Sequence, residues 1–488
     1  MNICMVSSES VPFSKSGGLA DVVGALSTAL ASLGEDVRVL LPLYGSGESS
    51  SFTELPVTLE LPLLGGEELV TFSETTLNKV TYYFLRHPYF TARKGIYGDT
   101  SFTPYCDNLR RFALLNKAAL ALCKALDWKP DVIHCHDWTT GFVPYLLKTE
   151  QDPFFGKTRS MMTIHNLAYQ GEFSRLELLG TDIMPEERMF SGERANKRTN
   201  MLKTGLEFAD LLTTVSPTYA KEIQTQEFGC HLEGLLSERK NQLNGIINGI
   251  DYEEWNPETD PFLTHHFSAE NLAGKELTKA EIQAEFSLEV DASIPLFAMI
   301  SRLAEQKGFV ELLEGSPCAL ERMLTEQRMQ MIIVGTGDHT LEKKLVEIGK
   351  NHPNLSVNIL FSNRAAHLLE AGADFFLMPS RYEPCGLNQL YSLRYGTLPV
   401  ARRTGGLADS IIDLDENQEE GTGILFEQMS GHGILEAVER SLVWYRKGQK
   451  SMNEIRTRCM QWDSTWQRSA HSYLALYESS IRGNYVCV

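Results

Sequence analysis

Two short stretches of the chain have nearly the same sequence and carry the residue types that can hold an anion. Lys15 to Asp21 reads Lys-Ser-Gly-Gly-Leu-Ala-Asp, and Arg403 to Asp409 reads Arg-Thr-Gly-Gly-Leu-Ala-Asp. Each follows an apolar run and precedes a segment with helical periodicity, which predicts a Gly-Gly turn just before a helix. Backbone N–H groups at such a turn can approach a phosphate closely, and the helix end adds positive charge. Either copy alone could also be only a tight strand-to-helix turn.

The second half of the chain adds two cations and a carboxylate. Arg302 and Lys307 lie five residues apart, after an apolar run that ends at Ile300. Two positive charges at the carboxyl end of a strand could hold a diphosphate and stabilise it as a leaving group. Glu383, in the loop of residues 379–387, is suited to holding sugar hydroxyls or a developing positive centre. Glu383 could instead be an acid that merely complements the dipole of the next helix.

In the first half, polar residues end two apolar runs. His134, His136 and Asp137 belong to one of these ends, and His165 and Asn166 to the other. His134 and His136 share one face of the predicted strand, but no further ligand follows at zinc-binding spacing, so we predict no metal site. A polar pocket that binds hydroxyl groups fits these residues better. For any one histidine alone, a role in the core or in a turn is the default.

These side chains need elements that bring several strand ends together. In both halves, short apolar runs alternate with helical stretches, an order that predicts α/β architecture with two doubly wound, Rossmann-like domains. In such sheets, ligands bind outside the carboxyl ends of the strands, where Glu9 and His136 are also expected. The predicted strands are residues 3–6, 37–41, 80–85, 132–135, 161–164 and 211–215, and then 296–300, 331–334, 357–361, 375–378 and 398–401.

Composition narrows the class of protein. A chain of 488 residues exceeds one ordinary core and favours two domains. The net charge of −18 disfavours nucleic acid and anionic membranes as partners. Without a signal-peptide pattern or a run of about 18 apolar residues, we expect a cytoplasmic protein. The nine cysteines include no C-x-x-C pair, which favours reduced thiols.

Taken together, the motifs resemble those of the bacterial and plant glycogen/starch synthases, retaining glucosyltransferases of the GT-B fold. The resemblance runs over almost the whole chain. It is carried by residues 15–21, 95–98, 107–112, 136–138, 165–171, 214–220, 248–251, 301–308, 379–387 and 403–409.

The resemblance implies two Rossmann-like domains facing a deep interdomain cleft. Residues 1–248 would form the acceptor side and residues 249–462 the side of the nucleotide-sugar donor, and a helix in residues 463–488 would return to the first domain. The implied reaction transfers glucose from ADP-glucose to the non-reducing 4-hydroxyl end of an α-1,4-glucan such as glycogen. It retains the anomeric configuration and needs no metal or other cofactor. The oligomeric state is not predicted.

The resemblance also assigns roles to single residues. The expected catalytic residues are His165, Arg302, Lys307 and Glu383. The expected donor-binding residues are Lys15, Gly18, Asp21, Asn248, Phe361, Cys385, Gly386, Leu387, Thr404, Gly405 and Gly406. Tyr97 and Asp137 are expected to bind the acceptor, Tyr97 as an aromatic platform. A covalent intermediate on a carboxylate such as Asp137 is left open.

The donor and the activity are each open to a second interpretation. Leu360-Phe361 replaces a Gly-Tyr pair common in the family, so the base pocket could differ and the donor could be UDP-glucose. The chain could also be a sucrose synthase-like transferase or a phosphorylase, but a phosphorylase would need a pyridoxal phosphate lysine that no motif supports. A non-catalytic glucan-binding relative would be expected to lack one of the five residues Lys15, His165, Arg302, Lys307 and Glu383, all of which are present.

Overall fold

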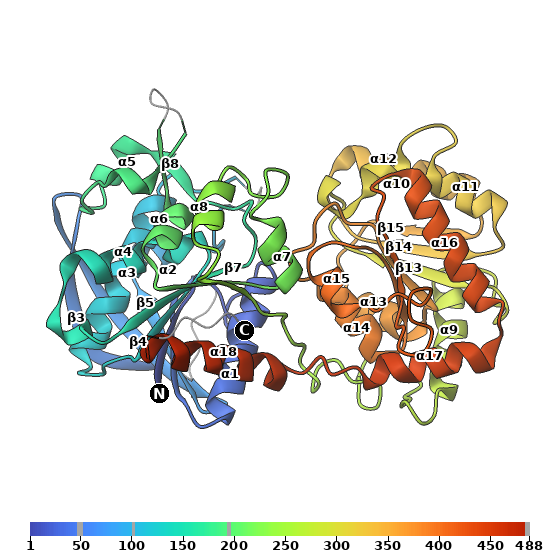
Figure 1. Ribbon diagram of the computed structural model, residues 1–488, viewed down its shortest axis with the longest axis horizontal. Coiled ribbons are helices and arrows are strands. Elements are labelled where there is room, and N and C mark those ends of the chain that lie inside the picture. Colours follow the sequence, from blue (N-terminus) through green and yellow to red (C-terminus); the bar gives the residue numbers. More distant parts are fainter. Residues whose placement is uncertain (46–51, 100–102, 193–196, 484–488) are drawn as a thin grey trace. The chain divides into compact units, whose positions relative to one another are not determined.

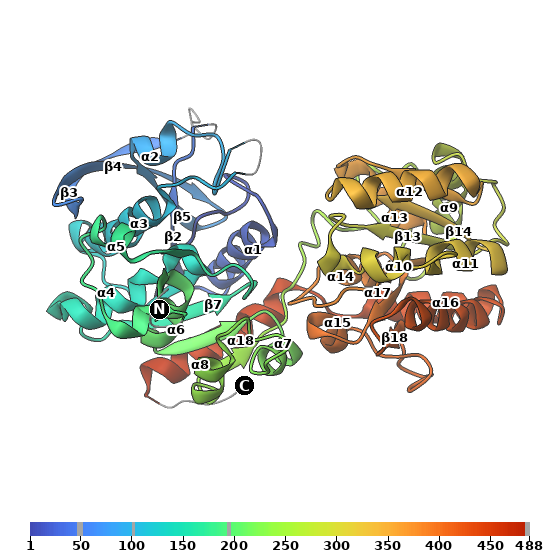
Figure 2. The ribbon, with the colours of Figure 1, turned by 90° about the horizontal axis from the view of Figure 1, so that it is seen from above.

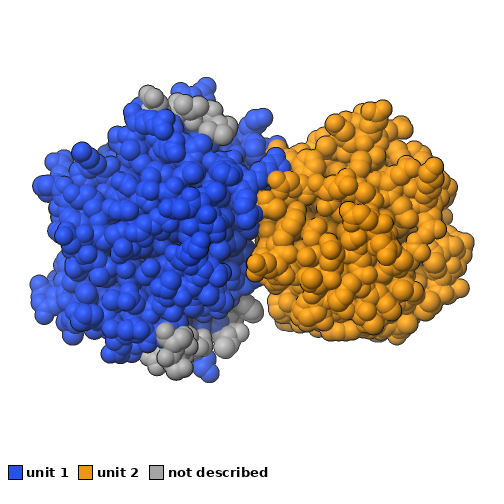
Figure 3. Space-filling view, turned by 90° about the horizontal axis from the view of Figure 1, so that it is seen from below, with its two compact units in different colours: residues 1–248, 466–488 blue, residues 249–465 orange. Residues whose placement is uncertain are grey.

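The computed structural model describes residues 1–45, 52–99, 103–192 and 197–483. The chain divides into two compact units: unit 1 comprises residues 1–248 and 466–488, and unit 2 comprises residues 249–465 (Figure 3). The acceptor and donor roles of the two domains stay predictions. Among the described residues, no helix is long and apolar enough to span a membrane.

Unit 1 is built on a nine-stranded sheet with the order β12-β11-β7-β6-β1-β2-β5-β4-β3. From β12 to β5 all neighbours are parallel, as predicted, whereas β4 pairs antiparallel with both β5 and β3. The strands are β1 (Asn2–Val6), β2 (Asp36–Pro42), β3 (Thr53–Leu63), β4 (Gly66–Leu77), β5 (Val80–Arg86), β6 (Val132–His136), β7 (Arg159–Ile164), β11 (Leu211–Thr214) and β12 (Leu243–Gly245). A small second sheet holds β8 (Glu172–Ser174), β9 (Phe190–Ser191) and β10 (Arg198–Asn200).

The β3–β4 hairpin was not predicted from the sequence. Along β3, exposed and half-buried residues alternate through most of the strand, and only Leu61 and Leu63 are buried. An edge hairpin with one face in water lacks the continuous apolar run that identifies a buried parallel strand.

Helices cover both faces of the unit 1 sheet. On one face α1 (Gly18–Ser32) packs with α18 (Trp466–Ile481), and the two helices lie side by side in Figures 1 and 2. On the other face, Cys123 of α3 (Asn108–Ala125) lies 4.0 Å from Cys4 of β1. The remaining helices are α2 (Pro88–Thr91), α4 (Phe142–Glu150), α5 (Arg175–Leu179), α6 (Met201–Phe208), α7 (Pro217–Glu222) and α8 (Glu233–Glu238).

Unit 2 contains a six-stranded parallel sheet with the order β15-β14-β13-β16-β17-β18. Its strands are β13 (Leu296–Ile300), β14 (Gln330–Val334), β15 (Leu355–Asn358), β16 (Phe375–Met378), β17 (Leu398–Arg402) and β18 (Ile424–Phe426). The prediction of a strand over 357–361 is wrong at its end, because pairing with β14 stops at Asn358. Ser362 then caps the next helix, so Phe361 lies in the connecting loop.

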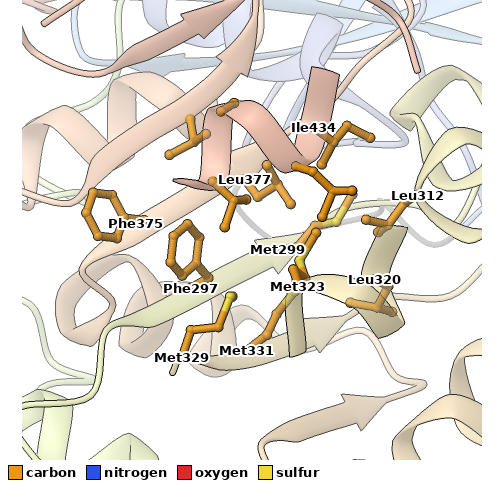
Figure 4. Close-up of a cluster of buried hydrophobic side chains, with 14 of the residues drawn as sticks. Phe297, Met299, Leu312, Leu320, Met323, Met329, Met331, Phe375, Leu377 and Ile434 are labelled. Carbon is orange, nitrogen blue, oxygen red and sulfur yellow. The ribbon is translucent and has the colours of Figure 1, made fainter. Parts of the chain in front are cut away.

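Two apolar layers enclose the unit 2 sheet. The layer in Figure 4 joins inward-facing residues such as Phe297 and Met331 to Leu312, Met323 and Ile434 of the helices that cover that face. These helices are α10 (Phe309–Leu313), α11 (Ala319–Glu326), α12 (His339–Asn351), α16 (Gly431–Tyr445) and α17 (Gln449–Gln461). The opposite face is covered by α9 (Ala273–Glu285), α13 (Asn363–Gly372), α14 (Asn388–Arg394) and α15 (Gly405–Ser410).

Candidate active site

A pocket of about 200 Å³ opens at the carboxyl ends of β13 and β16 in unit 2. The predicted residues that line it are Arg302, Lys307, Glu383, Gly386 and Leu387. They come from two loops far apart in the sequence, which parallel neighbouring strands deliver to one edge of the sheet. The pocket therefore combines two cations with a carboxylate.

Lys307 and Glu383 form the charged centre of this pocket. Nζ of Lys307 lies 2.6 Å from Oε2 of Glu383, and Oγ of Ser380 donates to the same oxygen at 2.9 Å. Glu383 is only 6% exposed. The Arg302 side chain is exposed and forms no ion pair among the described residues. Arg302 is thus a cation that remains available to an anionic ligand.

Close backbone packing holds the two loops together. The N–H of Arg381 donates to the carbonyl of Gln306 at 2.8 Å, and Nδ2 of Asn388 donates to the carbonyl of Ile300 at 2.9 Å. Gly308 has φ +80°, and a Cβ there would lie 1.9 Å from the Pro379 carbonyl oxygen. Only glycine permits this approach, which sets the distance from Lys307 to Glu383.

The second Gly-Gly loop lies behind Glu383 and is not part of the pocket lining. Thr404, Gly405 and Gly406 are buried, and the N–H of Gly406 donates to the Glu383 carbonyl at 3.0 Å. A Cβ on Gly406 would lie 2.0 Å from the carbonyl oxygen of Cys385, which is itself buried. This loop therefore supports the backbone that carries Glu383, while its predicted contact with the donor stays a prediction.

Phe361, the predicted contact to the base, is 94% exposed and does not line the pocket. Its side chain lies in the loop after β15, beside Leu360, which is also exposed. An aromatic ring this exposed has little packing role in the described structure, so it is free to stack on a ligand.

The first Gly-Gly loop, in unit 1, is exposed from Lys15 to Gly18. Nζ of Lys15 pairs with Oδ1 of Asp21 at 2.7 Å, and burial raises the pKa of Asp21. Glu9, at the end of β1, accepts hydrogen bonds from the N–H of Ser16 and from Oγ of Ser16, the latter at 2.9 Å. Glu9 thereby holds the loop at the strand end.

Glu9 also binds Tyr97. The hydroxyl of Tyr97 donates to Oε1 of Glu9 at 2.9 Å and lies 2.9 Å from Oγ of Ser8. Burial raises the pKa of Glu9. Because its hydroxyl is held in this way, the half-buried Tyr97 ring is fixed in one orientation, as an aromatic platform for a sugar would require.

Asp137 occupies a strained backbone position directly after β6. Its φ is +54°, a region that side chains other than glycine rarely adopt. Oδ1 of Asp137 accepts a hydrogen bond from the N–H of His165 at 2.7 Å. Burial raises the pKa of Asp137 to about 7. Asp137 thus fixes the backbone of His165, and its predicted contact with the acceptor stays a prediction.

His165 also contacts a second histidine. Its Nε2 lies 3.0 Å from Nδ1 of His136, and the His136 ring lies against the His134 ring, with centroids 4.1 Å apart and the ring planes tilted by 33°. Asn248, the last residue of this part of unit 1, is buried, and its Oδ1 has no hydrogen-bond partner among the described residues.

Glu9 and His136 were predicted from the sequence as strand-end residues, but without a role. The sequence could not show which residues contact them. Ser16 and Tyr97 contact Glu9, and His165 contacts His136, only in the folded chain. Ser380 was missed as a partner of Glu383, although its place in the same loop was the available signal. Within the described ranges, no group of three or more His, Cys, Asp or Glu residues is placed to hold a metal ion.

Comparisons with known proteins agree over the whole chain. Residues 2–238 match the family described as the starch synthase catalytic domain, and residues 282–454 match glycosyl transferases group 1. A glycogen synthase of Treponema denticola is 41% identical over 485 residues, which are 99% of each chain. A glycogen synthase of Myxococcus xanthus is 44% identical over 491 residues, covering 99% of this chain and all of the relative.

A solved structure gives the same result for the fold. The catalytic domain of starch synthase IV from Arabidopsis thaliana, bound to ADP and acarbose, superposes with a TM-score of 0.88 at 31% identity, covering 99% of each chain. Identity of this extent over full length, together with paired α/β units, establishes the relationship. The chain belongs to the glycogen/starch synthase family of glycosyltransferases with the GT-B fold.

Proposed function

We propose that this enzyme takes ADP-glucose as its donor and extends the non-reducing end of an α-1,4-glucan such as glycogen with retention of configuration. The observation that carries the proposal is the unit 2 pocket, where two cations stand beside a nearly buried carboxylate. The neighbour from Arabidopsis, whose bound ligands are ADP and acarbose, supports both the base and the glucan.

In this proposal, Arg302 and Lys307 neutralise the diphosphate and Glu383 holds the glucose hydroxyls. The acceptor 4-hydroxyl oxygen approaches C1 of glucose from the face that the diphosphate leaves, so the configuration at C1 is retained. It forms a bond to C1 while the bond from C1 to the diphosphate oxygen breaks. The electron pair leaves with ADP, where the two cations stabilise the new charge. The acceptor proton passes to a phosphate oxygen, so no separate protein base is required.

Unit 1 supplies the remaining residues in this proposal. His165 and Asn248 contact the glucose of the donor, and Lys15 adds a third positive charge for the diphosphate. Tyr97 and Asp137 bind the acceptor glucan. These roles follow from the family resemblance, and the hydrogen bonds of Glu9 and Asp137 described above support the fixed orientation that they need.

The test is incorporation of labelled glucose into glycogen, with ADP-glucose and UDP-glucose compared at equal concentration. We expect efficient transfer from ADP-glucose. No transfer from either donor would overturn the proposal, and a preference for UDP-glucose would replace only the base assignment. Lys350→Ala is a matched control for charge removal, because Lys350 is exposed and its ion pair is a 3.2 Å contact with Glu347 on the same helix.

A further inference from the structure

We propose that His136 is a positioning residue that sets the tautomer of His165, so that Nδ1 of His165 carries the proton and donates a hydrogen bond to the substrate. The inference rests on the proposed function, in which His165 contacts the sugar of the donor. It starts from one contact: Nδ1 of His136 lies 3.0 Å from Nε2 of His165.

Both imidazoles are neutral at physiological pH. Burial lowers the pKa of His165 to about 3 and lowers the pKa of His136 well below its ordinary value. A neutral imidazole has one N–H and one lone pair in the ring plane. Of the two nitrogens that meet, one therefore donates and the other accepts, which leaves two possible arrangements.

The surroundings of His136 decide between them. Its other nitrogen, Nε2, is buried and has no hydrogen-bond partner among the described residues. If Nε2 carried the proton, a buried donor would be left without an acceptor, which is rare in folded proteins. If Nδ1 carries it, the proton lies in the hydrogen bond to His165 and only a lone pair stays unpaired. The second arrangement is the more stable.

The consequence falls on His165. Since its Nε2 accepts the proton of His136, the proton of His165 must lie on Nδ1. Nδ1 of His165 makes no hydrogen bond to the described part of the chain. It is also not one of the buried side-chain atoms that lack a partner, so it is accessible to a ligand. The backbone N–H of His165 is separately fixed by Asp137. His165 is thus held as a hydrogen-bond donor, suited to a lone pair on a sugar hydroxyl.

The C-terminal helix α18 fixes the other side of this cluster. Nδ1 of His134 lies 2.7 Å from the hydroxyl of Tyr477, and Nε2 of His134 lies 2.5 Å from Oγ1 of Thr163. The His134 ring in turn lies against the His136 ring. Tyr477→Phe therefore offers a matched control: it removes a buried hydrogen bond of the same cluster but leaves the His136–His165 contact in place.

The direct test is the ring ¹⁵N NMR spectrum of the full-length protein labelled at histidine, at pH 7 and without ligand. His165, assigned by comparison with His165→Asn, is expected to show protonated Nδ1 and unprotonated Nε2. Protonated Nε2 on His165 would overturn the inference. Because this measurement does not depend on turnover, it stays informative even if the proposed donor and acceptor are wrong.

A kinetic test compares replacements of His136 that keep or remove an N–H at the place of Nδ1. Asparagine at this position can present an N–H near the place of Nδ1, whereas leucine cannot. We expect His136→Leu to lower kcat by about ten- to a hundredfold through misplacement of His165, and His136→Asn to recover most of that loss. Tyr477→Phe should change kcat far less than His136→Leu. Equal losses in His136→Leu and His136→Asn, or in Tyr477→Phe, would mean that the cluster acts only through packing.

Discussion

The two Gly-Gly loops share five residue types in order, yet they occupy opposite environments. In unit 1 the loop from Lys15 to Gly18 is exposed, and a Cβ on Gly17 would meet no atom within 4 Å. In unit 2 Gly405 and Gly406 are buried, and a Cβ on either would lie 2.0 Å from a carbonyl oxygen. In the first loop glycine leaves the backbone open to solvent, and in the second loop it allows the backbone to pack closely against neighbouring carbonyl groups.

The backbone N–H groups of the two loops also have different partners. The N–H of Gly406 is already bonded to the carbonyl of Glu383. In the first loop the N–H of Ser16 is bonded to the side chain of Glu9, whose pKa burial raises. We infer that the second loop positions Glu383, and that the first loop can offer its surface and Lys15 to an anion.

The largest contrast is expected in stability. Gly406→Ala places a methyl group against the Cys385 carbonyl, so it should lower the free energy of unfolding by about 3 kcal/mol. Gly17→Ala should change it by no more than about 0.5 kcal/mol, since its φ of −161° suits any residue. Chemical denaturation followed by fluorescence measures both. Equal destabilisation would refute the contrast.

The next largest effect is expected on the catalytic rate, at the Lys307–Glu383 pair of unit 2. Lys307→Ala removes a charge from the pocket and leaves Glu383 with Ser380 as its remaining side-chain partner there, so we expect kcat to fall about 10²–10³-fold. Glu383→Ala should cause a similar loss, and the double variant should lose less than the sum because the two groups form one pair. Initial rates with Lys350→Ala as control test this. Wild-type turnover by folded Glu383→Ala would remove Glu383 from the chemistry.

In unit 1, the buried carboxyl group of Asp137 should make the free energy of unfolding depend on pH. Burial raises the pKa of Asp137 from 3.8 to about 7, so between these values the folded state binds a proton that the unfolded state has lost. Stability from this group is present below about pH 4 and is lost as pH rises to 7, at about 1.4 kcal/mol per pH unit.

Asp137→Asn cannot ionise and can still accept the hydrogen bond from His165. Urea denaturation of this variant and the wild type between pH 5 and 7 should therefore show a flatter profile for the variant. Parallel profiles would mean that Asp137 is already ionised in the folded protein.

The smallest effect is expected for the first loop. The Lys15 side chain is 55% exposed, and its ion pair with Asp21 is of the surface kind, which contributes little to stability. Lys15→Ala should leave the unfolding midpoint nearly unchanged and raise KM for the donor by about tenfold, the loss of one charge-assisted hydrogen bond. A loss as large as that in Lys307→Ala would show that the first loop binds the diphosphate as strongly as the second unit does.

Much of the scaffold could be predicted from the sequence. The continuous apolar runs at residues 3–6 and 296–300 identified buried parallel strands, because such strands bury both faces. Strand β3 could not be identified, since its pattern depends on which side meets water. For the site, spacing found Lys307 and Glu383 as separate candidates, but no local pattern indicates a 2.6 Å contact between residues 76 positions apart.

By itself, the sequence determined two α/β units, the strand-end loops and the charged residues in them, because these follow from local periodicity and turn chemistry. Only the tertiary structure decided how the two Gly-Gly loops differ. The N–H of Ser16 bonds to the side chain of Glu9, whereas the N–H of Gly406 bonds to the carbonyl of Glu383, and each partner depends on what the fold packs against the loop. The same is true of the contact between His136 and His165, which β6 and β7 bring together only as neighbours in the folded sheet.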